Sequence, residues 1–211
     1  MDSQRTGTTT IGIKCSDGIV LLADKRSSAG HLVANKEEEK IKIIADNIAV
    51  TTAGLVSDAQ LLTKLIRAEL RLIKIRRGGE DPRVKEAANL LATFLYHNIR
   101  KMSMVPGIVG FLLGGKDNEG FKLYDLGMDG SVTEHKDFTA SGSGCELALG
   151  VLESIYEQDI NIQKGIQIGI RAMNSSLKRD LASGNGIDVY IITKDGIKRE
   201  LTKKIETSVA V

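Results

Sequence analysis

The chain has 211 residues, of which 42% are hydrophobic and 27% charged, a composition typical of one soluble globular domain and unlike that of a disordered chain. Its 29 basic and 27 acidic side chains are interspersed and give a net charge of +2, so no basic patch predicts a nucleic-acid partner. No secretory signal and no run of roughly 18 apolar residues occurs, which predicts a cytoplasmic protein without a membrane partner.

The first half of the chain begins with two predicted hairpins. Extended runs at 8–15 and 19–23 flank Ser16-Asp17-Gly18, whose residues suit a tight turn. A second pair of runs at 41–45 and 48–53 is joined by a short Asp-Asn turn. The apolar density of 19–23 exceeds strict alternation, so we expect these strands to be covered on both faces.

Two amphipathic helices are predicted after the hairpins. Ser57 and Asp58 are candidate caps for the first helix, whose apolar residues recur at spacings of three and four before Gly78-Gly79 ends it. Asp81-Pro82 predicts a cap with proline at the first position of the second helix. We expect the two helices to form an antiparallel pair.

The second half predicts a meander, two further helices and a final hairpin. The strands are expected at 108–113, 121–125 and 131–133, the helices at about 145–158 and 162–177, and the hairpin at 188–193 and 197–201. About ten strands and two helix pairs indicate an α+β fold of four layers, in which two packed sheets are each covered by a helix pair. The hairpins at the two ends of the chain are expected to share a sheet.

The stretch Gly7-Thr8-Thr9-Thr10 has two interpretations. Three threonines suit a strand, because a branched β-carbon packs well on a pleated surface. Alternatively, cleavage of the Gly7–Thr8 bond would make Thr8 an N-terminus with a nucleophilic hydroxyl and a free amine. The reference pKa of such an amine, about 7.7 to 8.0, suits a general base near neutral pH.

Three further residues fit this chemistry. Lys40 follows an acidic run and enters a strand, where its ammonium group would lower the pKa of a nearby amine. Asp24 ends an apolar strand and can pair with such a lysine. Gly54 lies between a strand and a helix, where a backbone N–H can stabilise an oxyanion.

The cysteines and histidines predict no alternative chemistry. Cys15 and Cys145 lack the spacing of zinc ligands or of a disulfide framework, so we expect two reduced thiols. His31, His97 and His135 stand in no recognisable catalytic motif, and structural or surface roles are expected for them.

The chain resembles the β-type subunits of the proteasome core particle, of the archaeal type, from Gly7 to about Leu201. The motifs are specific in combination: Gly-Thr-Thr-Thr at 7–10, Leu-Ala-Asp-Lys-Arg at 22–26, Ser-Ala-Gly at 28–30, Lys40, Thr-Thr-Ala-Gly at 51–54, Ser-Asp-Ala-Gln at 57–60, Gly-Ser-Gly at 142–144, Gly-Val-Leu-Glu at 150–153, Lys-Arg-Asp at 178–180 and Ser-Gly at 183–184. This resemblance implies the αββα sandwich of N-terminal nucleophile hydrolases, which matches the predicted order of elements.

The resemblance also implies roles for site residues. Thr8 would be the nucleophile with its own amine as base, Lys40 the ammonium that lowers the pKa, Asp24 its orienting carboxylate and Gly54 the oxyanion donor. Ser143, Asp180 and Ser183 would hold the amine and a bridging water. The pocket for the substrate residue before the cut would be lined by Ser27, Glu38, Thr52 and Val56. No metal or organic cofactor is implied.

The implied protein is a threonine endopeptidase that degrades unfolded proteins. Residues 1–7 would be a propeptide removed autocatalytically at Gly7–Thr8, and residues 8–211 a single N-terminal nucleophile hydrolase domain. The implied partners are sibling β subunits in a heptameric ring stacked on α-subunit rings, an ATP-dependent regulatory cap and unfolded substrates.

Two departures from the family pattern and three alternatives accompany this hypothesis. Cys145-Glu146 stands where relatives often carry Ser-Pro, and Asn185-Gly186 stands where Gly-Met is commoner, which concerns local geometry and subunit contacts. The main alternative is a non-catalytic structural β subunit of the same ring. The simpler bacterial two-ring protease is disfavoured by the Arg-Asp-x-x-Ser-Gly signature at 179–184, and a gating α-type subunit by the absence of an extra N-terminal helix.

Overall fold

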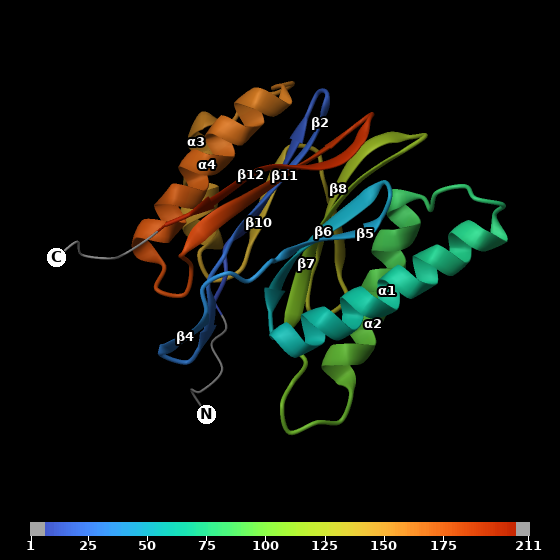
Figure 1. Cartoon of the computed structure of the whole chain (residues 1–211), viewed down its shortest axis with the longest axis horizontal. Helices are drawn as coiled ribbons and strands as arrows, with labels where there is room; N and C mark the ends of the chain where they lie inside the picture. Colours follow the sequence, from blue (N-terminus) through green and yellow to red (C-terminus); the bar gives the residue numbers. More distant parts are fainter. Residues whose placement is uncertain (1–6, 206–211) are drawn as a thin grey trace.

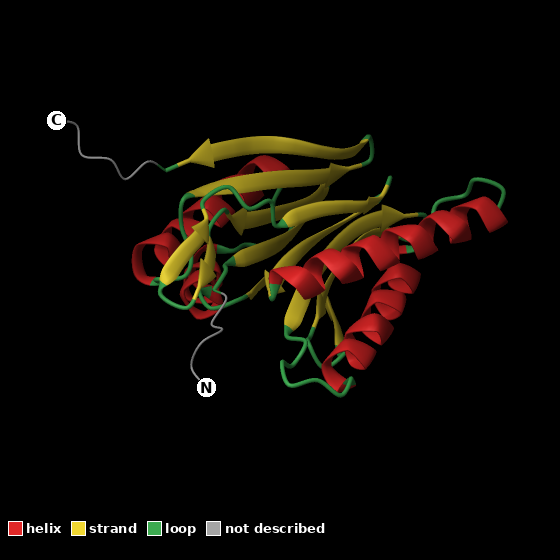
Figure 2. Cartoon of the chain, turned by 60° about the horizontal axis from the view of Figure 1, so that its bottom comes forward, coloured by secondary structure: helices red, strands yellow, loops and turns green. Residues whose placement is uncertain are grey.

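Two five-stranded antiparallel sheets lie face to face between two pairs of helices, which makes the fold a four-layer αββα sandwich (Figure 1). The computed structural model describes residues 7–205 of the chain. The predicted fold class is therefore confirmed. Figure 2 shows the stacked strands with helices on both outer sides.

The first sheet joins strands from both ends of the chain, as the sequence predicted. Its spatial order is β10 (Phe138–Ser141), β1 (Thr10–Cys15), β2 (Gly18–Asp24), β11 (Gly186–Thr193) and β12 (Gly196–Lys204). The helices α3 (Cys145–Ile155) and α4 (Ile162–Arg179) cover its outer face.

The second sheet carries the predicted meander. Its spatial order is β5 (Ile41–Ala45), β6 (Ile48–Gly54), β7 (Val109–Asp117), β8 (Gly120–Leu126) and β9 (Val132–His135). The helices α1 (Val56–Arg76) and α2 (Val84–Arg100) pack on its outer face. A small separate sheet pairs β3 (Ser27–Ala29) with β4 (Leu32–Asn35).

The buried strand β2 shows why the apolar run at its centre does not alternate. Val20 and Leu22 point into the core beneath α3 and α4, whereas Ile19 and Leu21 point into the core between the two sheets. All four side chains are fully buried. Burying each such side chain stabilises the fold by roughly 1.5–3 kcal/mol, which favours apolar residues at every position of this strand. The expectation that the strand is covered on both faces is confirmed.

The helix starts differ from the predictions. The helix α1 begins at Val56 after Leu55, so Ser57 and Asp58 lie inside it and are not its caps. The helix α2 begins at Val84, whose backbone N–H donates to Asp117 Oδ2 at 2.8 Å, so a carboxylate from the end of β7 takes the role predicted for Asp81. A distant contact thus replaced the predicted cap of α2, whereas the N-cap residue of α1 makes no side-chain cap hydrogen bond.

Three short strands and one helix end were not predicted correctly. The strands β3, β4 and β10 were missed, because they are only three or four residues long and β4 is exposed throughout. The helix α3 ends at Ile155 instead of near 158.

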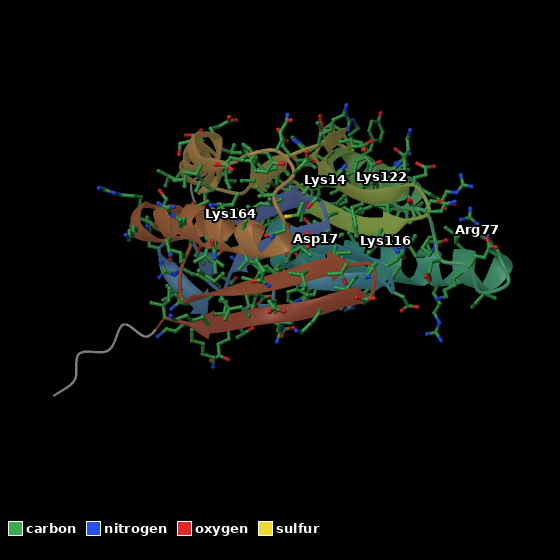
Figure 3. All side chains as sticks on the ribbon, turned by 90° about the horizontal axis from the view of Figure 1, so that it is seen from above. Lys14, Asp17, Arg77, Lys116, Lys122 and Lys164 are labelled. Atoms are coloured by element: carbon green, nitrogen blue, oxygen red, sulfur yellow. The ribbon has the colours of Figure 1, made fainter. Side chains whose placement is uncertain are left out.

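Charged side chains lie at the end of the sandwich that holds the turn between β1 and β2, and several of them are labelled in Figure 3. Asp17 between β1 and β2 accepts a hydrogen bond of 2.8 Å from the Ile162 backbone N–H, which ties this turn to the beginning of α4. Lysines such as Lys14 and Lys164 lie on the same surface. The termini of the described chain and the hairpin of β3 and β4 lie away from it (Figure 1).

Candidate active site

The strand register brings distant residues together beside Thr8. Thr10 of β1 pairs with Ala23 of β2 on one side and with Ser141 of β10 on the other. The residues that precede β1 therefore lie beside Asp24, which ends β2, and beside the loop that follows β10. This loop leads to Ser143 and into α3.

Thr8 is held in place through its backbone. It is 5% exposed, and its nitrogen donates to Ser143 Oγ at 3.2 Å. Its carbonyl oxygen accepts from the Gly144 N–H at 3.4 Å. A Cβ on Gly142, whose φ is +93°, would lie 2.1 Å from that oxygen, so only glycine fits here. The chain includes Gly7, so the Thr8 nitrogen is a peptide nitrogen in this structure.

Asp24 and Lys40 form a buried ion pair next to Thr8. The Lys40 Nζ lies 2.6 Å from Asp24 Oδ1, and the two residues are 4% and 0% exposed. Asp24 also accepts backbone N–H bonds from Thr9 at 3.0 Å, Arg26 at 3.0 Å and Gly184 at 2.9 Å. Burial lowers the pKa of Lys40 from its ordinary value, and the Asp24 carboxylate opposes this shift. The site thus places a perturbed ammonium group beside the candidate nucleophile.

A hydroxyl–carboxylate network completes the surroundings of the Thr8 nitrogen. Ser143 Oγ and Ser183 Oγ both donate to Asp180 Oδ2, each at 2.6 Å. Ser183 Oγ also lies 2.7 Å from Thr9 Oγ1. Asp180 follows the last residue of α4, so the end of this helix positions the carboxylate.

A cavity of about 350 Å³ opens at Thr8 between the two sheets' ends and α1. Lys40 and Gly54 line it together with Thr8. The four residues expected to form a substrate pocket also line it: Ser27, Glu38, Thr52 and Val56. The structure therefore brings the whole set predicted from the sequence to one place.

Gly54 occupies a position that excludes any other residue. Its φ is +130°, and a Cβ would lie 2.3 Å from the Ile108 carbonyl oxygen. It is the last residue of β6, and α1 begins two residues later. The backbone at the wall of the cavity is therefore fixed by close packing against the residues that precede β7.

Arg26, for which the sequence predicted no role, braces the loop between α4 and β11. Its Nη1 donates to the Leu181 carbonyl oxygen at 2.7 Å, and its Nε donates to Asn185 Oδ1 at 2.8 Å. Asn185 has a φ of +63°, a conformation that asparagine tolerates better than most residues. Asn185, one of the two departures from the family pattern, thus anchors the loop that carries Ser183. Cys145, at the other departure, is the first residue of α3.

Comparison with known proteins identifies the family. The profile described as "Proteasome subunit" matches residues 4–192. The chain is 43% identical over 201 residues to the proteasome subunit beta of Methanocaldococcus jannaschii, covering 95% of this chain and 88% of that protein. It is 42% identical over 210 residues to that of Archaeoglobus profundus, covering 98% and 95%. The chain belongs to the proteasome subunit family.

Within this family the chain is of the β type, since the proteasome subunit beta of Ferroglobus placidus is also 44% identical over 188 residues, covering 89% of this chain and 87% of that protein. A proteasome β subunit assembles with other subunits into the core particle. None of the helices in residues 7–205 is both long and apolar enough to cross a membrane. Within the same range, both cysteines are free thiols, as predicted, and His, Cys, Asp and Glu side chains form no group suited to a metal.

Proposed function

We propose that the chain is a threonine endopeptidase subunit that hydrolyses peptide bonds of unfolded proteins, with Thr8 as its N-terminal nucleophile. The observation that carries the proposal is the convergence of four charged or polar residues at Thr8. The Thr8 nitrogen donates a hydrogen bond to Ser143 Oγ, which in turn donates to Asp180. Lys40 lines the cavity at Thr8 and forms an ion pair with Asp24. Buried ionisable groups clustered in a cavity are typical of catalytic sites.

Activation requires the removal of residues 1–7, of which residues 1–6 lie outside the described residues. The Thr8 hydroxyl attacks the Gly7 carbonyl carbon, the Gly7–Thr8 amide bond breaks, and an ester forms between Gly7 and Thr8 Oγ. Water then hydrolyses this ester, which leaves a carboxylate on Gly7 and a free amine on Thr8. Residues 8–211 are the mature domain.

Hydrolysis of a substrate uses the freed amine as the base. The amine accepts the Thr8 hydroxyl proton while Oγ attacks the substrate carbonyl, and the Gly54 N–H stabilises the tetrahedral oxyanion. The leaving amine takes a proton as the substrate peptide bond breaks, and water hydrolyses the resulting ester. The Lys40 ammonium lowers the pKa of the Thr8 amine by like-charge repulsion, and Ser143, Asp180 and Ser183 hold this amine.

The surroundings of this reaction follow from the family. We infer a heptameric β ring stacked on α-subunit rings in the cytoplasm, fed with unfolded proteins by an ATP-dependent cap. Inside such a closed particle, proteolysis is limited to chains that are threaded in.

The test combines intact mass with activity. Core particles assembled from this chain and its α partner should contain a β subunit that has lost the mass of residues 1–7 and should cleave a fluorogenic peptide. Thr8→Ala should keep the full mass and lose at least 10³-fold in rate, because the nucleophile is lost and the nitrogen that acts as base stays in the uncut peptide bond. Thr93→Val, an exposed change on α2, is the matched control and should behave as the wild type.

The second candidate is a non-catalytic structural β subunit. Assembled particles in which the chain keeps its full mass, with equal peptide turnover before and after Thr8→Ala, would establish it. The polar network around Thr8 argues against this candidate, because a structural subunit gains little from burying Asp24 and Lys40.

A further inference from the structure

The cavity beside Thr8 continues along α1, beyond the four pocket residues expected from the sequence. Its far part is lined by Lys42 on β5 and by Gln60, Thr63, Lys64 and Arg67 on α1. Residues spaced by three and four lie on one side of a helix, so this side of α1 faces β5 across the cavity. The cavity therefore has a reactive end at Thr8 and a polar end between α1 and β5.

Thr63 offers an unused hydroxyl to this polar end. The residue is 5% exposed, and its Oγ1 has no hydrogen-bond partner within residues 7–205. Thr93 on α2 shows the usual alternative, because its hydroxyl donates to the Asn89 carbonyl oxygen of its own helix at 3.0 Å. A buried hydroxyl without a partner costs stability unless a ligand satisfies it. Thr63 therefore gives the wall of the cavity a buried hydroxyl that a polar group of a ligand can satisfy.

Some charges near the cavity are already balanced. Lys40 is paired with Asp24 at 2.6 Å. Glu39 forms an ion pair with Arg199 of β12, and its Oε2 lies 3.8 Å from the Nζ of Lys42. These pairs leave little net charge at the reactive end.

The charges at the polar end are not balanced. Lys64 and Arg67 form no ion pair in the described part of the chain, although Arg67 Nε donates to the Ile43 carbonyl oxygen at 2.8 Å. Lys42 shares Glu39 with Arg199, and the other carboxylate that lines the cavity is Glu38, which accepts from Asn35 Nδ2 at 3.0 Å. Four cations, Lys42, Lys64, Arg67 and Arg199, thus stand against two carboxylates, Glu38 and Glu39, which gives this end an excess of positive charge.

We propose that this cavity selects substrate peptides with an acidic side chain, above all glutamate, at the residue before the cut. The carboxylate lies between Lys42 and the cations of α1, and the Thr63 hydroxyl donates a hydrogen bond to it. This inference rests on the proposed function, because it names the preferred substrate of the same site. The preference is a difference in affinity between two side chains of equal length, glutamate and glutamine.

The experiment measures kcat/KM of assembled particles for two fluorogenic peptides that differ only in glutamate or glutamine before the leaving group. A leucine peptide of the same length reports general hydrolysis. We expect glutamate to exceed glutamine about 10-fold at low ionic strength, with a smaller ratio at 0.5 M salt because screening weakens partly exposed charges. Lys42→Gln should bring the ratio near one, and Thr63→Val should reduce it about 3-fold. Lys164→Gln removes an exposed lysine from α4 and should leave the ratio unchanged.

The outcomes separate the two proposals. A glutamate-to-glutamine ratio of one or less in particles that cleave the leucine peptide overturns the acidic preference and leaves the proposed function standing. A ratio that Lys164→Gln changes as much as Lys42→Gln also overturns it, because the effect is then one of total charge. Failure to cleave all three peptides in particles of verified assembly contradicts the proposed function itself.

Discussion

Replacement of Asp24 by asparagine tests the buried ion pair with almost no change in side-chain volume. Asp24 accepts four hydrogen bonds, two on each oxygen: Lys40 and Thr9 on Oδ1, and Arg26 and Gly184 on Oδ2. An asparagine side chain can satisfy only one of these two sets. In either orientation its NH₂ group faces two donors, so two buried N–H groups lose their acceptor.

The expected loss of stability follows from that count. Each buried donor without an acceptor costs about 1–3 kcal/mol, and removal of one partner of a buried ion pair costs about 3–5 kcal/mol. We therefore expect Asp24→Asn to lower the free energy of unfolding by about 3–5 kcal/mol. For a chain of this size that corresponds to a fall in Tm of roughly 10 °C, measured by circular dichroism on the purified chain. Peptide hydrolysis by assembled particles should fall by at least 10²-fold.

Asp188 provides the matched control. It is 2% exposed and pairs with the buried Lys25 at 2.8 Å, but neither residue lines the cavity at Thr8. Asp188→Asn should cost a similar amount of stability and leave hydrolysis within about 2-fold at temperatures below its unfolding. Wild-type activity in folded Asp24→Asn particles would refute the role of Asp24. An equal loss of activity in both variants would show that folding, and not chemistry, is affected.

Three further predictions concern Lys40, Cys15 and Gly7. Burial lowers the pKa of Lys40 from 10.5, so just below pH 10.5 the unfolded chain binds more protons than the folded chain, and the free energy of unfolding should rise with pH. Urea denaturation at several pH values should show that Lys40→Met removes this rise. An unchanged slope of stability against pH would contradict the assignment to Lys40. Burial raises the pKa of Cys15 to about 12, so a maleimide at pH 8 should modify the part-exposed Cys145 and leave Cys15 unmodified until the chain unfolds. Equal labelling of the two cysteines in mass spectrometry would contradict this. A Cβ on Gly7 would lie 1.6 Å from the Cβ of Ala182, so Gly7→Ala should slow the loss of residues 1–7 at least 10-fold. Adding Ala182→Gly should restore part of this rate, as followed by a time course of intact mass.

The order and type of the main elements could be predicted because local patterns agree with the final packing. The apolar run at 19–23 indicated a strand covered on both faces, and β2 has a core on each side. The start of α2 could not be predicted from Asp81-Pro82, because the acceptor for the Val84 N–H comes from Asp117, 33 residues away. Nothing in the local sequence marks that contact.

The candidate site could likewise be predicted only where local sequence patterns indicate the contacts. The pairing of Asp24 with Lys40 was expected, since a carboxylate at a strand end and a lysine entering the next hairpin can meet. The roles of Arg26, Thr9 and Gly142 were not, because each depends on strands that pair across more than 100 residues of sequence. The cations at the far end of the cavity were not predicted, because only the packing of α1 against β5 brings Lys64 and Arg67 close to Lys42.

The two buried ion pairs also bear on why this polar centre exists. A buried pair rarely stabilises a protein more than apolar residues of the same volume would, so stability alone favours neither Asp24–Lys40 nor Lys25–Asp188. The second pair bridges β11 to the segment after β2, and Thr202 of β12 also donates to Asp188. It links three segments and does not line the cavity at Thr8. The first pair instead presents its lysine to the cavity at Thr8, where the desolvation that lowers the pKa of Lys40 is what a neighbouring amine requires to act as a base.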